Sequence, residues 1–466
     1  MLQDPVPGLL SRATEVLEAE FRALPTIGLA DQTAVDQTAI ARVLETTAHR
    51  LGDNYPYFHP LYAGQMLKPP HPVARAAYAL AMSLNPNNHA RDGGRASSEM
   101  EIEAVRQIAG MFGWAESESG FLGHLTSSGT IANLEALWVA GQSAPGRRIL
   151  GSEQAHYTHK RISAVLKLEY ASVAADSVGR MSMEALETEL RKGDVGTVVV
   201  TLGTTAIGAV DPLDEVLALR KRYSFRVHVD GAYGGYFKLI PEALDAPARR
   251  AFGAIGQADS IVIDPHKHGL QPYGCGCVLF RDPSVGRFYK HDSPYTYFTS
   301  KELHLGEISL ECSRAGASAV ALWATQQLLP LTPGGEFARG LAQGRAAALE
   351  LDKRLREDQA ERFQSLAPGT PQLDIVVWKL NADTAEEASA LAQKVFVACA
   401  TRDLHLALVE LPLAWFRPVA GFPSVDAEKN GFVTCLRSVL MKPEHEAWMD
   451  RIWERFSAGC AEVLGE

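Results

Sequence analysis

The sequence predicts an α/β protein with a mostly parallel sheet, helices on both faces of that sheet, a small α+β C-terminal domain and an N-terminal arm. Short runs rich in β-branched residues, such as TVVVTLG and FRVHVDG, alternate with amphipathic helical stretches from about residue 86 onward. At 466 residues the chain is also too long for one simple core. We therefore expect more than one lobe around a shared interior.

The distribution of helical and strand patterns divides the chain into three parts. Residues 1–85 combine two helical patterns, at 11–24 and 36–52, with the aromatic and proline-rich connection YPYFHPLYAGQMLKPPHP, and we interpret them as a helical arm used for dimerisation. Residues 86–330 form the large domain, and residues 331–466 form the small α+β domain. In the large domain we expect helices at 100–114, 131–142, 159–168, 182–193, 212–223 and 313–330, and strands at 147–152, 197–203, 225–231, 260–264 and 274–280. In the small domain we expect helices at 336–358 and 385–402, and strands at 372–380 and 432–441.

Composition argues against several classes of function. The formal net charge of -10 is spread without a basic stripe, so the electrostatic footprint of a nucleic-acid partner is missing. No apolar run approaches the roughly 20 residues that span a bilayer, and the first residues lack a secretory pattern. The 6 cysteines include no C-x-x-C pair, which suits free thiols in a reducing compartment. We expect a cytoplasmic protein with no nucleic-acid, membrane or metal partner.

One lysine stands out at the end of a predicted buried strand. In IVIDPHKHGLQP, Lys267 lies between His266 and His268. A lysine in such a place is usually a solvated flank, because lysine is rarely buried without a partner. His268 receives no role from the sequence.

Three further features weaken that ordinary reading, although each has a structural explanation of its own. Ser128, Gly129 and Thr130 open a helix, where free N–H groups and the helix dipole favour an anion, but a plain N-cap has the same letters. Asp230 follows a buried strand, where a carboxylate either meets a cation or caps a turn. His156 lies in a turn, where its ring either stacks on a ligand or belongs to the surface. The sequence after His156 lacks the glutamate of HExxH, so zinc is not expected.

Together these residues give an anion cradle, an imidazole, a carboxylate and a lysine at successive strand ends. Pyridoxal phosphate needs all four. Its aldehyde condenses with a lysine amine, its phosphate suits a helix N-terminus, and its ring nitrogen needs an acidic partner to work as an electron sink. We therefore predict pyridoxal 5'-phosphate as the cofactor.

The motifs that carry these residues also resemble a known family. From about residue 55 to the C-terminus, TSSGTIANLEAL, AHYTHK, TLGTTAIGAVDPL, HVDGAYGG, DPHKHGLQPYGCG and SRAGASA occur in order. They resemble the fold-type-I pyridoxal-phosphate decarboxylases of group II, which include glutamate, aromatic-amino-acid and tyrosine decarboxylases. The resemblance implies the fold-type-I architecture, with a seven-stranded type of sheet, and a homodimer whose active sites are shared between subunits.

The resemblance assigns roles position by position. It makes Lys267 the residue that holds the cofactor as a Schiff base, Asp230 the partner of the ring nitrogen and His156 the stacking residue. It places Thr204 near the ring. We further expect burial to lower the pKa of Lys267 and favour its nucleophilic amine. The phosphate is expected at Ser128, Gly129, Thr130 and His266.

Other assignments from the resemblance are looser. SRAGA, with Ser313 and Arg314, resembles a segment that reaches the partner's site. In the family a mobile loop carries a tyrosine that reprotonates the substrate carbanion. Here KHDSPYTYFTSKELHLGE offers Tyr295 and Tyr297; we favour Tyr295, and either is also explained as a packed loop aromatic.

Substrate contacts are expected at Arg437 and His89. Arg437 in TCLRSVLMKP matches an arginine that meets the substrate carboxylate in relatives, and a structural salt bridge explains it nearly as well. His89 is a candidate for the side-chain pocket, and packing of the arm at the dimer interface is an equal explanation.

The predicted reaction is the decarboxylation of an L-amino acid to its amine and CO₂. The motifs look closer to the tyrosine and aspartate branches, so an aromatic substrate such as tyrosine comes first. An acidic amino acid, or another pyridoxal-phosphate lyase reaction on the same fold, is the alternative. A non-catalytic binding protein is disfavoured because the lysine, the carboxylate and the cradle are all present.

Overall fold

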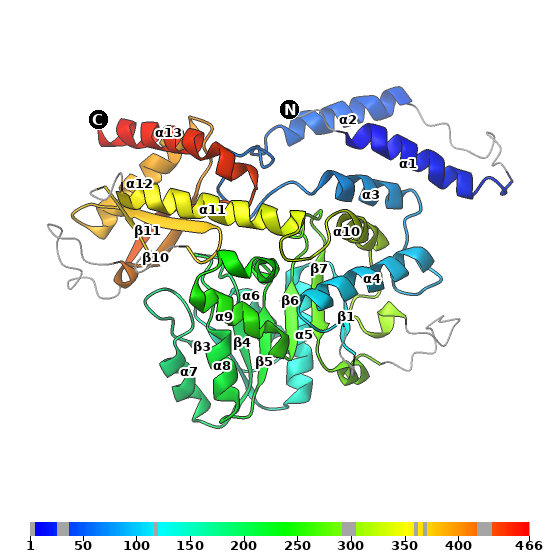
Figure 1. Ribbon diagram of the computed structural model, residues 1–466, viewed down its shortest axis with the longest axis horizontal. Helices are drawn as coiled ribbons and strands as arrows, with labels where there is room; N and C mark the ends of the chain where they lie inside the picture. The colour runs from blue at the N-terminus through cyan, green and yellow to red at the C-terminus, as the bar shows by residue number, and fades with distance from the viewer. Residues whose placement is uncertain are drawn as a thin grey trace.

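The computed structural model describes residues 5–25, 37–115, 120–290, 304–357, 362–366, 371–416 and 431–465. It contains two sheets, each with its own helices, and the large one lies below the small one in Figure 1. None of the helices in these ranges is long and apolar enough to cross a membrane.

The large sheet has seven strands in the order β1-β7-β6-β5-β4-β2-β3. β7 is antiparallel to its neighbours β1 and β6, and the other neighbouring strands are parallel to each other. This confirms the prediction of a mostly parallel sheet of seven strands. The strands are β1 Leu122–Thr126, β2 Arg148–Ser152, β3 Tyr170–Val173, β4 Val195–Thr201, β5 Arg226–Asp230, β6 Ser260–Ile263 and β7 Gly276–Phe280.

Helices cover both faces of this sheet, as the alternation of side chains along β4 shows. Val198 and Val200 pack into the main core, whereas Val199 packs on the other face with Leu137 and Ile162. Full burial on both faces explains why β4 reads as a continuous apolar run rather than an alternating one. The helices of this region are α4 Arg95–Met111, α5 Gly129–Ser143, α6 Thr158–Val165, α7 Met183–Leu190, α8 Leu213–Arg220, α9 Ala246–Ala254 and α10 Gly316–Leu328.

The small sheet is antiparallel, in the order β10-β11-β9-β8, and has its own apolar core with α11, α12 and α13. β11 pairs with β9 so that Arg437 lies opposite Val377. The elements are β8 Phe363–Ser365, β9 Ile375–Leu380, β10 Ala407–Pro412, β11 Phe432–Val439, α11 Glu336–Glu357, α12 Ala385–Ala400 and α13 Glu444–Leu464.

The N-terminal segment forms α1 Val6–Glu20, α2 Gln37–Leu51 and α3 Pro72–Met82, drawn in blue at the top of Figure 1. α3 packs on α10 and α1 packs on α3. Apolar side chains of α1 and α2 remain exposed, among them Val16, Val43 and Leu44. Of these helices, α1 and α2 were predicted from the sequence and α3 was not. The elements β1, β3, α9, β8, β10 and α13 were not predicted either.

Candidate active site

A cavity of about 180 Å³ opens where the strands of the large sheet end. Turns that follow β1, β2, β4, β5 and β6 all contribute to its wall, as expected for the carboxyl edge of a parallel sheet. The lining residues are Ser128, Gly129, Thr130, Asn133, His156, Thr158, Thr201, Gly203, Thr205, Asp230, Ala232, Tyr233, Asp264, His266 and Lys267.

Lys267 reaches this cavity from the turn after β6. Its Nζ lies 3.0 Å from Oδ2 of Asp264, and its side chain keeps 23% of its exposure. Burial acts to lower the pKa of Lys267, but the carboxylates of Asp264 and Asp230 outweigh burial and raise it above its ordinary value. The expectation of a lowered pKa was therefore wrong, because it considered burial without the two carboxylates.

Asp230 is held as a carboxylate at the end of β5. Oδ2 lies 2.8 Å from Nε2 of the fully buried His159, and Oδ1 accepts a hydrogen bond from the Ala232 amide at 3.1 Å. Burial would raise the pKa of Asp230, but His159, Lys267 and the amide of Ala232 lower it well below its ordinary value. A fixed negative charge of this kind can partner a protonated ring nitrogen.

A buried polar chain supports the wall behind Asp230 and the cradle. The His159 ring lies 6.2 Å from that of His228, whose Nε2 is 2.8 Å from Oδ1 of Asn133. Asn133 in turn donates to the backbone oxygen of Gly129 at 2.9 Å. Burial lowers the pKa of His228 to about 3, so this ring is neutral near neutral pH. Together these buried side chains thus contact both Asp230 and the start of the cradle helix.

The cradle at the start of α5 leaves little room beside Gly129. The Ser128 hydroxyl accepts from the Ile131 amide at 3.3 Å and caps the helix. A Cβ placed on Gly129 would come within 2.5 Å of the Asp264 carboxylate, so only glycine fits. Asp264 Oδ1 is itself buried without a hydrogen-bond partner in the described part of the chain. The glycine-bounded helix N-terminus fits the phosphate of pyridoxal phosphate, whereas the unsatisfied Asp264 oxygen lacks a hydrogen-bond donor among the described residues.

Two histidines complete the wall. His266 lies at 2.6 Å from the backbone oxygen of Cys275 through Nδ1, and its ring is 4.8 Å from that of Tyr273. His156 accepts from the Thr158 amide at 3.3 Å, and burial lowers its pKa, which keeps the ring neutral. A neutral flat ring at the cavity suits stacking on a pyridine.

Two other sequence-based candidates lie differently from what was expected. Thr205 lines the cavity, whereas the fully buried Thr204 uses its hydroxyl to accept from the Ala209 amide at 3.0 Å. Arg437 is buried and donates to the backbone oxygens of Thr205 at 2.7 Å and Ala206 at 2.9 Å. Arg437 therefore holds the turn that lines the cavity, and a contact with substrate stays a prediction.

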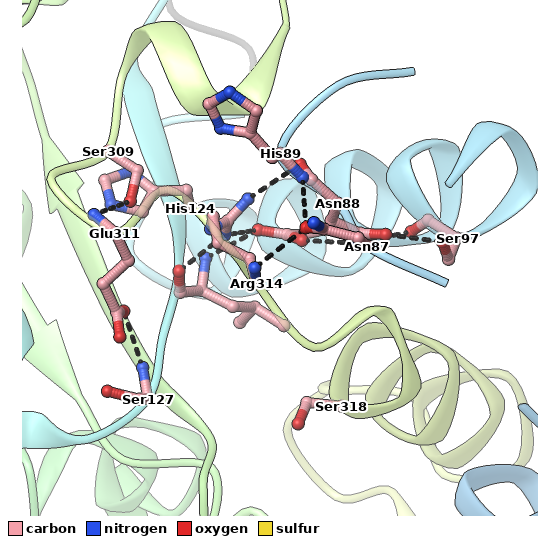
Figure 2. A network of polar contacts seen from close by, with 12 residues as sticks. Asn87, Asn88, His89, Ser97, His124, Ser127, Ser309, Glu311, Arg314 and Ser318 are labelled. Carbon is pink, nitrogen blue, oxygen red and sulfur yellow. Dashed lines mark hydrogen bonds and ion pairs between the residues drawn. The ribbon is translucent and has the colours of Figure 1, made fainter. Parts of the chain in front are cut away.

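The SRAGA segment braces the cradle within the same chain (Figure 2). Arg314 is buried, pairs with Glu101 and donates to the Leu125 oxygen at 2.6 Å. Glu311 accepts from the Ser127 amide at 2.9 Å, next to the cradle. Ser313 between them is exposed.

His89 lies beside this segment, and its backbone oxygen accepts from the Gly306 amide at 2.9 Å. His89 and Ser313 are absent from the described lining of the cavity, so their predicted roles stay predictions. Tyr295 and Tyr297 lie outside the described residues.

Sequence reasoning missed Asp264, His159 and Glu311. Asp264 is the first residue of DPHK and directly follows a predicted strand. That position at a strand end could have indicated a site residue. His159 stands three residues after His156, and no role was predicted for it. No local pattern in the sequence pointed to Glu311. Among the described residues no cluster of three or more metal-ligating side chains occurs.

Comparison with known proteins places the chain among decarboxylases. Residues 55–329 match the family described as "Pyridoxal-dependent decarboxylase conserved domain". An L-tyrosine decarboxylase of Enterococcus faecium is 27% identical over 438 residues, which cover 72% of this chain and 70% of that protein. A probable L-tyrosine/L-aspartate decarboxylase of Methanothermobacter thermautotrophicus is 29% identical over 317 residues, with coverages of 68% and 82%. A solved structure of Oryza sativa TDC with PLP and tryptamine has a TM-score of 0.76 at 18% identity and covers 99% of both chains, which is a likeness of fold.

Proposed function

The chain belongs to the pyridoxal-dependent decarboxylase family, and we propose that it acts on an aromatic L-amino acid, with L-tyrosine as the first candidate. It is a pyridoxal-phosphate-dependent carboxy-lyase for an amino acid. The names of the two relatives above support tyrosine. The observation that carries the reaction type is the cavity in which Lys267, Asp230 and the Ser128–Thr130 cradle meet.

When bound, pyridoxal phosphate supplies an aldehyde that condenses with amines and a pyridine ring that accepts electrons from the breaking bond. The residues of this chain position that chemistry. Lys267 presents its amine to the aldehyde, and Asp264 orients that amine at 3.0 Å. Asp230 offers its negative charge to the ring nitrogen, and His159 and the Ala232 amide keep the carboxylate in place.

We assign the remaining contacts by the same reasoning. His156 stacks on the ring and excludes water from one face, and His266 binds the phosphate together with the cradle of Ser128, Gly129 and Thr130. Thr204 acts near the ring through the turn that it stabilises. His89, Arg437 and Ser313 are proposed as substrate or cofactor contacts on the resemblance alone. Tyr295, with Tyr297 as the other candidate, is proposed to return a proton to the α-carbon.

We also propose a homodimer with shared active sites and a cytoplasmic location. The exposed apolar side chains of α1 and α2 support a partner subunit, because such patches mark interaction surfaces. The 6 cysteines are all free, as expected in a reducing compartment. Light scattering on the purified holoenzyme tests the dimer; a monomeric mass would contradict it.

A screen of the twenty L-amino acids tests the substrate. Holoenzyme is incubated with each one, and CO₂ and the amine are measured together. We expect the highest kcat/KM with tyrosine. Turnover of aspartate or glutamate in its place would favour the acidic substrate that the second relative's name includes. Loss of the substrate without CO₂ would point to another lyase reaction, and Lys267→Ala serves as the blank.

A further inference from the structure

The turn that carries Lys267 sends consecutive side chains to opposite sides. Lys267 faces the cavity, whereas His268 is 1% exposed and packs behind the turn. The His268 ring lies 4.7 Å from the Tyr233 ring and 5.1 Å from the Phe237 ring, with interplanar angles of 65° and 86°. His268 is therefore a fixed element of the interior beside the reactive lysine.

One carboxylate of the small domain meets this interior. Asp374 directly precedes β9 and is 1% exposed. Its Oδ1 accepts a hydrogen bond from the Tyr233 hydroxyl at 2.5 Å, and its Oδ2 lies 3.3 Å from Nε2 of His268, a close contact outside hydrogen-bond geometry. Its backbone oxygen accepts from the Leu440 amide at 2.8 Å, which anchors it next to the end of β11. A single side chain thus joins the small sheet to two turns of the large one.

The pKa shifts define the protonation states of these three groups. Burial lowers the pKa of His268 well below its ordinary value, so the ring is neutral. Burial and the Asp374 charge raise the pKa of Tyr233, so the phenol keeps its proton. Burial raises the pKa of Asp374 to about 6, although Tyr233, Lys68 and Arg437 counteract it. At neutral pH Asp374 is therefore a carboxylate with a phenol and an imidazole as its neutral neighbours.

The two turns held in this way carry the two groups proposed for the chemistry. Tyr233 lines the cavity three residues after Asp230, and His268 follows Lys267. We propose that Asp374 is a positioning residue that fixes the turn bearing Asp230 relative to the turn bearing Lys267, acting through Tyr233 and His268. The inference rests on the roles proposed above for Lys267 and Asp230. It also gives His268 the role that the sequence could not supply.

The test uses Asp374→Asn in the holoenzyme, with Asp352→Asn as a matched control. Asp352 is a buried carboxylate of α11 that accepts from Arg356 at 2.8 Å and belongs to the small domain. Three quantities are measured: the cofactor Kd, the pH at which the visible absorbance of the lysine-bound cofactor changes, and kcat and KM separately. For Asp374→Asn we expect a spectral midpoint shifted by about one pH unit and kcat lowered about tenfold, with KM within about twofold. For Asp352→Asn we expect a lower Tm and an unchanged spectral midpoint.

Milder variants keep the proposal testable if Asp374→Asn fails to fold. Tyr233→Phe and His268→Asn each remove one neighbour of Asp374 and should shift the spectral midpoint in the same direction. Because both act through one carboxylate, the double variant should shift it by less than the sum of the two single shifts.

Two results would overturn the proposal: a spectral midpoint and kcat that stay at wild-type values while only the Tm falls, or additive shifts in the double variant. If Lys267→Ala retains the visible absorbance, the proposed site itself is wrong. That outcome is distinct from an Asp374→Asn variant whose spectral midpoint and kcat stay at wild-type values.

Discussion

The two sheets contribute to the cavity in different ways. The large sheet brings reactive groups to one edge, because its strands β4, β5 and β6 are parallel and end together. Among the described lining residues none comes from the small sheet, yet Asp374 and Arg437 reach from it to hold turns that do line the cavity. On the proposed roles, the large sheet supplies the reactive groups and the small sheet positions them. Substitutions in the two sheets should fail in different ways.

The largest effect is expected for Lys267→Ala in the large sheet's edge. Removing the amine proposed to bind the cofactor should lower kcat/KM by at least about 10³-fold, the scale seen when a catalytic nucleophile is removed. The visible absorbance of the lysine-bound cofactor should disappear as well. Both are measured on protein purified with added pyridoxal phosphate. Lys221→Ala, at the exposed end of α8, is the control and should behave as wild type. Persistence of the absorbance in Lys267→Ala would refute the assignment of the lysine.

Asp230→Asn should have the next largest effect. Loss of the charge proposed to stabilise the ring nitrogen should lower kcat about 10²- to 10³-fold. His159→Gln leaves the charge but removes its 2.8 Å neighbour, so a smaller loss is expected. Because the pKa of Asp230 is lowered below 3.8, its charge persists above about pH 4, and the stability tied to it falls only in more acidic solution. Stopped-flow and steady-state kinetics between pH 5 and 8 provide the check. An equal loss in both variants would mean that orientation matters as much as charge.

This difference between the sheets also explains what could be predicted from sequence. Lys267, Asp230, His156 and the cradle each follow a strand or begin a helix. A parallel sheet brings the ends of its strands together, whatever the length of chain between them. The letters of the chain were therefore enough to place them at one edge.

The supporting residues depend on contacts between distant segments. Asp374 meets Tyr233 across 141 positions, and Glu311 meets Ser127 across 184. No local periodicity or spacing encodes such a pair. The raised pKa of Lys267 was not predicted for the same reason, because it depends on where the Asp264 and Asp230 side chains point. Side-chain geometry, rather than element order, was the missing information.

Gly129→Ala tests the cradle and should have an intermediate effect. A Cβ there would lie 2.5 Å from Asp264, so the helix start or the carboxylate must move, at a cost of about 1–3 kcal/mol. We expect the cofactor Kd to rise about 10- to 100-fold, measured by titration of the apoprotein. Gly253→Ala in α9 is the matched control. Its new Cβ meets nothing within 4 Å, and it should stabilise the fold by about 0.4–1 kcal/mol. A wild-type Kd for Gly129→Ala would remove the cradle from the cofactor site.

Arg437→Lys in the small sheet should have the smallest effect and the most diagnostic one. A lysine cannot reproduce the guanidinium's bonds to the Thr205 and Ala206 oxygens, so the turn that lines the cavity loses its support. Support of the turn alone predicts that the cofactor Kd rises by up to about tenfold and the Tm falls with KM nearly unchanged, whereas the proposed substrate contact predicts a raised KM. Arg148→Lys, which disturbs an ion pair between the buried Arg148 at the start of β2 and the half-exposed Asp194, controls for stability alone. A raised KM at unchanged Tm and cofactor Kd would show that Arg437 meets the substrate, as the resemblance implies, and the small sheet would then supply binding chemistry as well as position.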